Sequence, residues 1–133
     1  MPRARSLLFV LALATVATAA SASAAPSPQL LPVLQRLLER DVAQAAVMID
    51  CTYAARGAEG VAFPAWRGLR PEIYVKPRVC ADANAAVGGC RQPSCSPERA
   101  GAALLVLAHE ATHIAGVTDE TAAECAALAR VAE

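Results

Sequence analysis

The most informative part of the chain is residues 96–131, which read SPERAGAALLVLAHEATHIAGVTDETAAECAALARV. Ser96 is a good helix N-cap, because its hydroxyl can accept a hydrogen bond from the backbone of the first turn. Pro97 suits the first helical position, and Glu98 suits the positive end of the helix dipole. The apolar run that follows predicts a helix from Pro97 to about Ala115.

A second helix is predicted after a very short connection. Gly116 is placed to end the first helix in a left-handed conformation. Thr118 or Asp119 then caps a helix that runs from Glu120 to about Val131. Because the connection is so short, the two helices must turn back sharply on each other.

The first of these helices carries an HExxH motif, His109-Glu110-Ala111-Thr112-His113. Residues four apart lie one above the other on a helix face, so the two imidazoles can bind one Zn²⁺ ion. Glu110 then lies beside the open position of the metal, where it can take a proton from a bound water. The motif contains both of the chain's two histidines.

The same helix is apolar on nearly every side, which predicts that it is buried. Burying two imidazoles and a carboxylate without partners is costly. A metal ion removes that cost, and the sequence therefore predicts zinc binding by His109 and His113.

The third zinc ligand must come from outside the motif, and no histidine remains to supply it. Glu120 and Glu124 are four residues apart and share one face of the second helix. Ala123 and Ala127 are small, so this helix can approach the first one closely. Asp119 is the rival ligand, although a helix cap already explains an aspartate at this position.

These residues resemble the gluzincins, zinc peptidases in which HExxH is followed by ExxAD or NExxSD. Here His109-Glu110-x-x-His113 is followed by Glu120-x-x-Ala123-Glu124. The resemblance implies that Glu120 is the third zinc ligand and that Glu124 orients His109. Glu124 stands where the family has an aspartate, and the gap from His113 to Glu120 is much shorter than in thermolysin-like enzymes.

The small size of the chain resembles the minigluzincins, single-domain zinc peptidases reduced to a few helices and a small sheet. This resemblance implies a mostly helical α+β domain in which the HExxH helix packs on a second, C-terminal helix. The pattern HEAxHxxGVxDExxAEC also resembles small secreted actinobacterial proteins. The resemblance is good over residues 104–128 and poor elsewhere.

A second family, the metzincins, resembles the same stretch in a different register. The pattern His109-Glu110-x-x-His113-x-x-Gly116-x-x-Asp119 is similar to the snapalysin-like variant, which implies Asp119 as the third ligand. A metzincin needs a methionine turn after the motif. Both methionines of this chain precede the motif, so Asp119 is the less favoured alternative.

The N-terminus has the features of a signal peptide. Arg3 and Arg5 form a basic start, an apolar stretch of signal-peptide length follows, and an A-x-A cleavage site ends at Ala24. We therefore predict a signal peptide at residues 1–24 and a secreted or extracytoplasmic domain at residues 25–133. The apolar stretch is shorter than the ~20 residues that span a bilayer, so an uncleaved anchor is the less favoured alternative.

Cysteine usage follows from that location. In an oxidising compartment, disulfides are the default state of Cys51, Cys80, Cys90, Cys95 and Cys125. Five is an odd number, so two internal disulfides and one free thiol are expected. Cys90 and Cys95 can close a local loop, which leaves the other three competing for one bridge.

The amino-acid composition excludes further classes of protein. The 133 residues contain 12 basic and 12 acidic side chains, and this zero net charge argues against a nucleic-acid partner. The first 24 residues hold two arginines and no acids, so the mature chain has 10 basic and 12 acidic residues and a charge of −2. With 56% hydrophobic residues, the chain is too apolar to be disordered.

The middle of the chain gives weaker signals. Residues 45–51 fit either a helix extension or a strand, and residues 73–76 fit a strand that pairs with an extended substrate. Around them we predict helices at about 29–44 and 79–87, and a loop at 54–71 with a short extended piece at 61–63.

The sequence thus predicts a secreted zinc metallopeptidase that hydrolyses peptide bonds, with no nucleic-acid partner and no membrane contact after signal cleavage. The first alternative is a zinc-stabilised secreted binding domain without turnover, and the second is a disulfide-stapled structural protein. The residue that stabilises the oxyanion is left open among Tyr53, Tyr74, Arg70 and Arg99. The sequence does not decide the oligomeric state.

Overall fold

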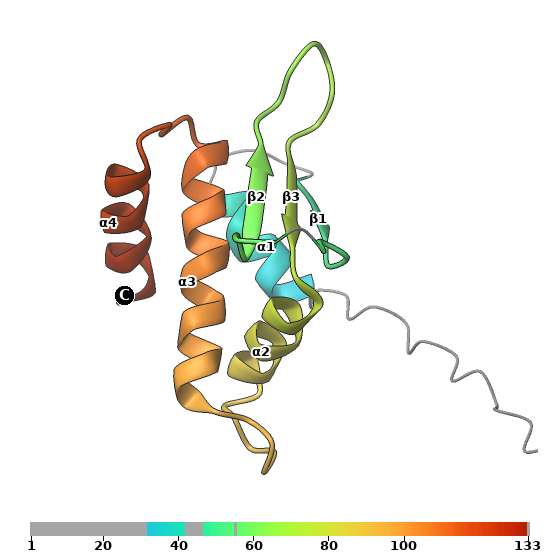
Figure 1. The fold of residues 1–133 in the computed structure, drawn as a ribbon, viewed down its shortest axis with the longest axis vertical. Helices are drawn as coiled ribbons and strands as arrows, with labels where there is room; N and C mark the ends of the chain where they lie inside the picture. Colours follow the sequence, from blue (N-terminus) through green and yellow to red (C-terminus); the bar gives the residue numbers. More distant parts are fainter. Residues whose placement is uncertain (1–31, 42–46, 55, 133) are drawn as a thin grey trace, which may run out of the picture.

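The computed structural model describes residues 32–41, 47–54 and 56–132 and has an α+β fold, as predicted (Figure 1). The predicted signal peptide and its cleavage site lie outside the described residues. The elements, in chain order, are α1 (Pro32–Asp41), β1 (Met48–Asp50), β2 (Gly60–Phe63), β3 (Glu72–Val75), α2 (Pro77–Val87), α3 (Pro97–Ile114) and α4 (Glu120–Val131).

The three strands form one mixed sheet in the order β1-β3-β2. β1 runs parallel to β3, with Ile49 opposite Ile73, and β2 runs antiparallel to β3, with Ala62 opposite Ile73. The prediction that residues 73–76 form a substrate-pairing edge is therefore wrong. β3 is the central strand, and both of its sides already pair with strands of the chain.

The core lies between the sheet and the helices. Along β3, Ile73 and Val75 are fully buried, and the residues beside them are half-buried, as expected for a strand with one covered face. α3 crosses this face and contributes Leu107, Ala111 and Ile114 to the same apolar cluster. The HExxH helix is thus an element of the core, and Figure 1 shows it between α4 and the sheet.

Most of the predicted elements are found, with shifted ends. Residues 48–50 form strand β1, which decides between the two alternatives for residues 45–51. Helix α2 begins at Pro77, two residues earlier than predicted, because Pro77 occupies the first helical turn directly after Lys76. Helix α1 is described over Pro32–Asp41, within the predicted residues 29–44.

The cysteines behave as predicted. Disulfides join Cys51 to Cys80 and Cys90 to Cys95, and Cys125 is a free, exposed thiol. The first disulfide ties the end of β1 to α2, across 29 residues of sequence. Disulfides persist in oxidising compartments, which indicates an extracytoplasmic protein. Within the described ranges, no helix has the length and apolar character needed to cross a membrane.

Candidate metal site

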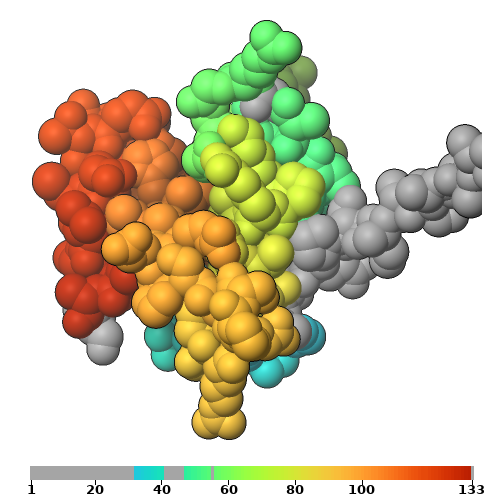
Figure 2. Space-filling view, turned by 60° about the horizontal axis from the view of Figure 1, so that its bottom comes forward, coloured from blue at the N-terminus to red at the C-terminus, as the bar shows by residue number. Residues whose placement is uncertain are grey.

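The two helices that carry the site are fixed by local interactions. Ser96 caps α3 by accepting a hydrogen bond from the Arg99 backbone, and Gly116 reverses the chain after α3 with a φ of +99°. Asp119 caps α4 by accepting a 2.7 Å hydrogen bond from the Ala122 backbone. α4 therefore folds back along α3, as Figure 2 shows in red beside orange, and the polar faces of the two helices meet.

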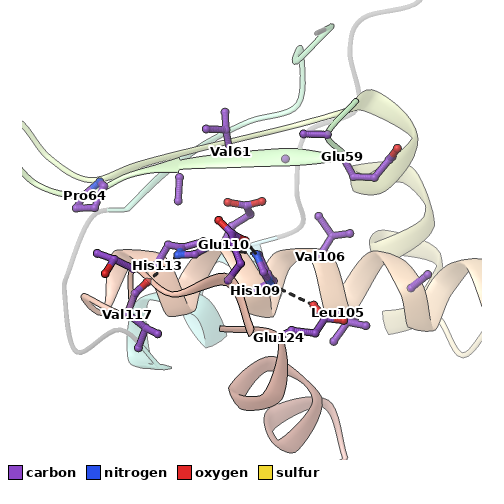
Figure 3. A pocket seen from close by; sticks show the side chains of 16 residues that line it. Glu59, Val61, Pro64, Leu105, Val106, His109, Glu110, His113, Val117 and Glu124 are labelled. Carbon is purple, nitrogen blue, oxygen red and sulfur yellow. Dashed lines mark hydrogen bonds and ion pairs between the residues drawn. The ribbon is translucent and has the colours of Figure 1, made fainter. Parts of the chain in front are cut away.

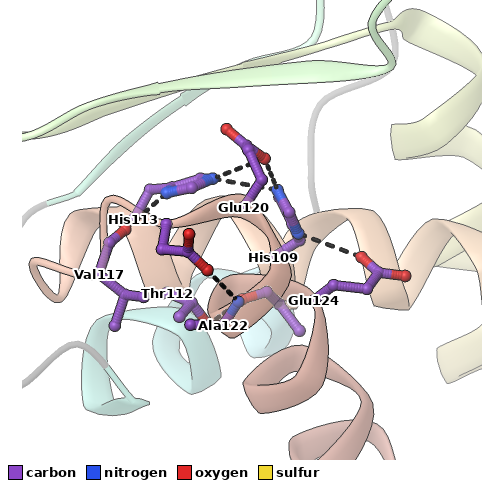
Figure 4. Close-up of polar contacts among 9 residues, drawn as sticks. His109, Thr112, His113, Val117, Glu120, Ala122 and Glu124 are labelled. Atoms are coloured by element: carbon purple, nitrogen blue, oxygen red, sulfur yellow. Dashed lines mark hydrogen bonds and ion pairs between the residues drawn. The ribbon is translucent and has the colours of Figure 1, made fainter.

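Three side chains from α3 and α4 converge on one point (Figure 4). The Nε2 atoms of His109 and His113 lie 3.0 Å apart. One carboxylate oxygen of Glu120 lies 3.1 Å from Nε2 of His109 and 3.5 Å from Nε2 of His113. His109, His113 and Glu120 thus form a group that could hold a metal ion.

The neighbour of Nδ1 in each imidazole indicates which ring nitrogen carries the proton. Nδ1 of His113 donates a 2.7 Å hydrogen bond to the Val117 carbonyl oxygen, which can only accept. Nδ1 of His109 is buried and lies 3.2 Å from a carboxylate oxygen of Glu124, without forming a hydrogen bond to it. Both neighbours are acceptors, so both protons belong on Nδ1 and both Nε2 atoms present lone pairs.

The donor set fits a zinc ion. Zinc binds imidazole nitrogen and carboxylate oxygen at about 2.0–2.2 Å, so two ligand atoms of a tetrahedral site lie roughly 3.3–3.6 Å apart. The three observed separations, 3.0, 3.1 and 3.5 Å, are close to this spacing. With both protons on Nδ1, two lone pairs and a carboxylate face one another, an arrangement that could hold a metal ion.

Glu110 lies on the same helix but points toward the sheet. Its side chain is 7% exposed, and in the part of the chain that the structure describes no hydrogen bond reaches its carboxylate. Burial raises the pKa of Glu110 above its usual value, and the nearby histidines partly oppose that rise. A carboxylate with a raised pKa is a better proton acceptor near neutral pH.

Gly60 on β2 makes room for Glu110. A Cβ atom at this position would lie 2.9 Å from Oε1 of Glu110 and 3.0 Å from the Val75 side chain. Only glycine therefore lets the edge strand approach Glu110 this closely without a shift in its neighbours. Sequence analysis missed this residue, because a glycine in a loop-like segment carries no sign of which distant side chain it faces.

A groove opens over this group, between β2 and α3 (Figure 3). It has a volume of about 660 Å³, and residues 58–62 of β2 and its approach form one wall. His109, Glu110 and His113 line the opposite wall, and Glu120 and Glu124 reach it from α4. The polar group is thus open to a molecule lying along β2.

No known protein family, curated protein or solved structure matches the chain.

Asp119, the alternative third ligand, has a different place in the structure. Its carboxylate is engaged with the backbone of Ala122 at the start of α4, and it is not part of the converging group. The first residue of α4, Glu120, reaches the two histidines instead. The geometry therefore favours Glu120 over Asp119.

The four candidates for an oxyanion partner do not line the groove. The Tyr74 hydroxyl donates to Glu72, Arg70 contacts Met48, and Arg99 lies 3.8 Å from Asp82. Tyr53 also lies outside the groove lining. The expectation that one of them serves the site is not supported, because none of the four lines the groove and three of them contact other residues.

Proposed function

We propose that this protein is a secreted zinc-dependent metallopeptidase, with His109, His113 and Glu120 as the zinc ligands. The observation that carries the proposal is the meeting of two imidazole lone pairs and one carboxylate oxygen within 3.5 Å, at the wall of a groove. Structural zinc sites have four protein ligands, whereas catalytic sites have three and leave one position open. Three ligands beside a groove match the catalytic kind.

A bound zinc ion supplies two things, a water whose pKa falls to about 7 and polarisation of a carbonyl group. The protein supplies the proton acceptor. Glu110 follows His109 directly in the helix, is not one of the three converging ligands, and is buried at the groove wall. A purely structural zinc site has no use for this costly buried carboxylate, whereas hydrolysis needs a base.

The substrate, in this proposal, is an extended peptide. Among the strands of the described residues β2 pairs with β3 on one side only, and residues 58–62 form a wall of the groove. An extended chain can add to such an edge through backbone hydrogen bonds. The wall residues Ala58, Gly60 and Ala62 are small, which leaves the backbone of β2 accessible to the substrate.

The glutamate that acts as base can be tested separately from the ligands. Zinc-loaded wild type and Glu110→Gln are assayed against a broad peptide library, with Glu98→Gln as a control. Glu98 lies in the exposed first turn of the same helix. We expect Glu110→Gln to keep its zinc and lose about 10²–10⁴-fold in hydrolysis, the usual contribution of a general base. Glu98→Gln should hydrolyse at the wild-type rate.

Two outcomes would contradict the proposal. Equal hydrolysis by wild type and Glu110→Gln would remove Glu110 from the mechanism. A zinc-loaded wild type that cleaves nothing in the library would instead indicate the zinc-stabilised binding domain without turnover.

A further inference from the structure

The connection between β2 and β3 is a hairpin whose tip, residues 63–70, extends beyond the sheet (Figure 1). Trp66 and Leu69 form an isolated antiparallel bridge, and the Leu69 backbone donates a 2.9 Å hydrogen bond to the Trp66 carbonyl. Arg67 and Gly68 between them have φ angles of +49° and +82°. Two successive positive φ angles define a type I′ turn, so the hairpin tip is an ordered element.

The hairpin tip exposes large apolar side chains. Trp66 is 67% exposed and Leu69 is 69% exposed, the highest values for large hydrophobic residues in the described ranges. Because they are paired across the turn, the two side chains lie on the same face of the hairpin. Phe63, 53% exposed, stands at the base of the hairpin tip and packs edge-on against Tyr74.

The charge of the hairpin tip is positive, and the next acid along the chain, Glu72, lies opposite Phe63 and accepts a hydrogen bond from the Tyr74 hydroxyl. Residues 60–71 contain Arg67 and Arg70 and no acidic residue, although basic and acidic residues are equal in number over the whole chain. The Arg67 guanidinium lies 4.5 Å from the centre of the Trp66 ring. The hairpin tip therefore combines an aromatic ring, an aliphatic side chain and two cations in the loop that extends beyond the sheet in Figure 1.

We propose that the hairpin tip docks on an anionic lipid surface. Trp66 and Leu69 would enter the interface between headgroups and acyl chains, where tryptophan is favoured. Arg67 and Arg70 would contact lipid phosphates, to which a tip that carries two cations and no acid of its own is complementary. A stable protein interface takes about 20–30 residues from each partner, whereas residues 63–70 of the hairpin tip number eight, so a lipid surface fits it better.

This contact would be peripheral, and it departs from the sequence-based expectation of no membrane contact. Pro64 belongs to both the hairpin tip and the groove wall. Docking would therefore hold the groove close to the lipid surface. The contact involves none of the residues that converge on the metal site, and its test needs neither zinc nor hydrolysis.

Trp66 is the only tryptophan of the chain, so its fluorescence reports on the hairpin tip alone. The protein is titrated with vesicles of phosphatidylcholine and with vesicles that also contain phosphatidylglycerol. We expect the emission to shift to shorter wavelength with the anionic vesicles, and the shift to weaken as salt is raised. The absence of a shift and of co-sedimentation with either vesicle would overturn the proposal.

Variants distinguish binding through the hairpin tip from non-specific binding of the protein to vesicles. Co-sedimentation with the anionic vesicles should fall about tenfold in Leu69→Ala and about fivefold in Arg70→Gln. The matched controls are Leu128→Ala, which changes a leucine 53% exposed on α4, and Arg91→Gln, which changes another exposed arginine. Both controls should bind like wild type. Equal losses in a tip variant and its control would overturn the proposal, provided that thermal melting shows all four variants folded.

Discussion

Both halves of α3 bury apolar side chains, but only the second half also buries polar ones. Residues 97–107 bury Ala100, Ala103 and Leu107, whose apolar side chains need no hydrogen-bonding partner. Residues 108–114 bury Glu110 and Thr112 and carry both histidines. Only the second half holds groups that lose free energy on burial unless a partner compensates.

The second half also separates a satisfied polar group from one that needs a further partner. The Thr112 hydroxyl donates a 2.8 Å hydrogen bond to the Ala108 carbonyl, so the helix itself satisfies it. Nε2 of His109, Nε2 of His113 and the Glu120 carboxylate instead face one another as acceptors. Both halves of α3 therefore pack in the core, through Leu107 in the first and Ile114 in the second, but only the second half also holds a polar site at the expense of stability.

The largest expected change in unfolding free energy comes from the first half. Leu107→Ala removes a side chain that is 2% exposed and should lower the unfolding free energy by about 2–5 kcal/mol. Below its melting temperature the variant should still bind one equivalent of zinc. Leu128→Ala, at a half-exposed position, should change stability by less than about 0.5 kcal/mol. Denaturant titration measures both. Loss of zinc from folded Leu107→Ala would break the distinction between the halves.

Substitutions at the polar site of the second half should lower the affinity for zinc. Glu124 lies against Nδ1 of His109, so Glu124→Ala should weaken zinc binding about 10–100-fold without abolishing it. Glu120→Ala should weaken it further, because that carboxylate contacts both Nε2 atoms. Glu98→Ala is the control and should bind zinc normally. A larger loss in Glu124→Ala than in Glu120→Ala would mean that the two glutamates have exchanged roles.

A pair of glycines tests the same distinction by added bulk. Gly60→Ala places a methyl group against Glu110 and Val75 and should cost about 1–3 kcal/mol while lowering hydrolysis. Gly101, in the first half of α3, has nothing within 4 Å of an added Cβ. Gly101→Ala should therefore stabilise the helix by about 0.5–1 kcal/mol and leave hydrolysis unchanged. Thermal melting and a peptide assay decide, and equal effects of the two substitutions would contradict this assignment.

Among the acids near the site, the cap of α4 should have the smallest effect on zinc binding. Asp119→Ala removes the hydrogen bond to the Ala122 backbone and should cost about 0.5–2 kcal/mol of stability. Zinc affinity should change far less than in Glu120→Ala. If a zinc titration shows Asp119→Ala as the more damaged of the two, Asp119 is the third ligand after all.

The C-terminal third of the molecule was predictable because its determinants are local. Ser96 and Asp119 act within one helical turn, Gly116 acts at its own φ angle, and His109 and His113 are neighbours on a single helix. The two acids of α4 follow within a few residues, after a turn too short to place them elsewhere. In these elements, the residues that contact one another are also close together in the sequence.

The sheet half was harder to predict because its determinants are distant in the sequence. β1 pairs with β3 across 24 residues, from Met48 to Glu72, and nothing near either strand signals that partner. Their pairing makes β3 central and leaves β2 at the groove, which reversed the predicted substrate edge. Another contact between distant parts of the sequence brought Gly60 of β2 against Glu110 of α3.

Metal analysis of the purified protein tests the central claim most directly. Wild type and His113→Ala are each dialysed against excess zinc, freed of unbound metal, and measured for zinc per chain by elemental mass spectrometry. The chain has only two histidines, so no other imidazole can replace His113. We expect about one equivalent in wild type, as a single three-ligand site requires, and almost none in His113→Ala. Full zinc retention in His113→Ala, or no zinc in folded wild type, would contradict the account.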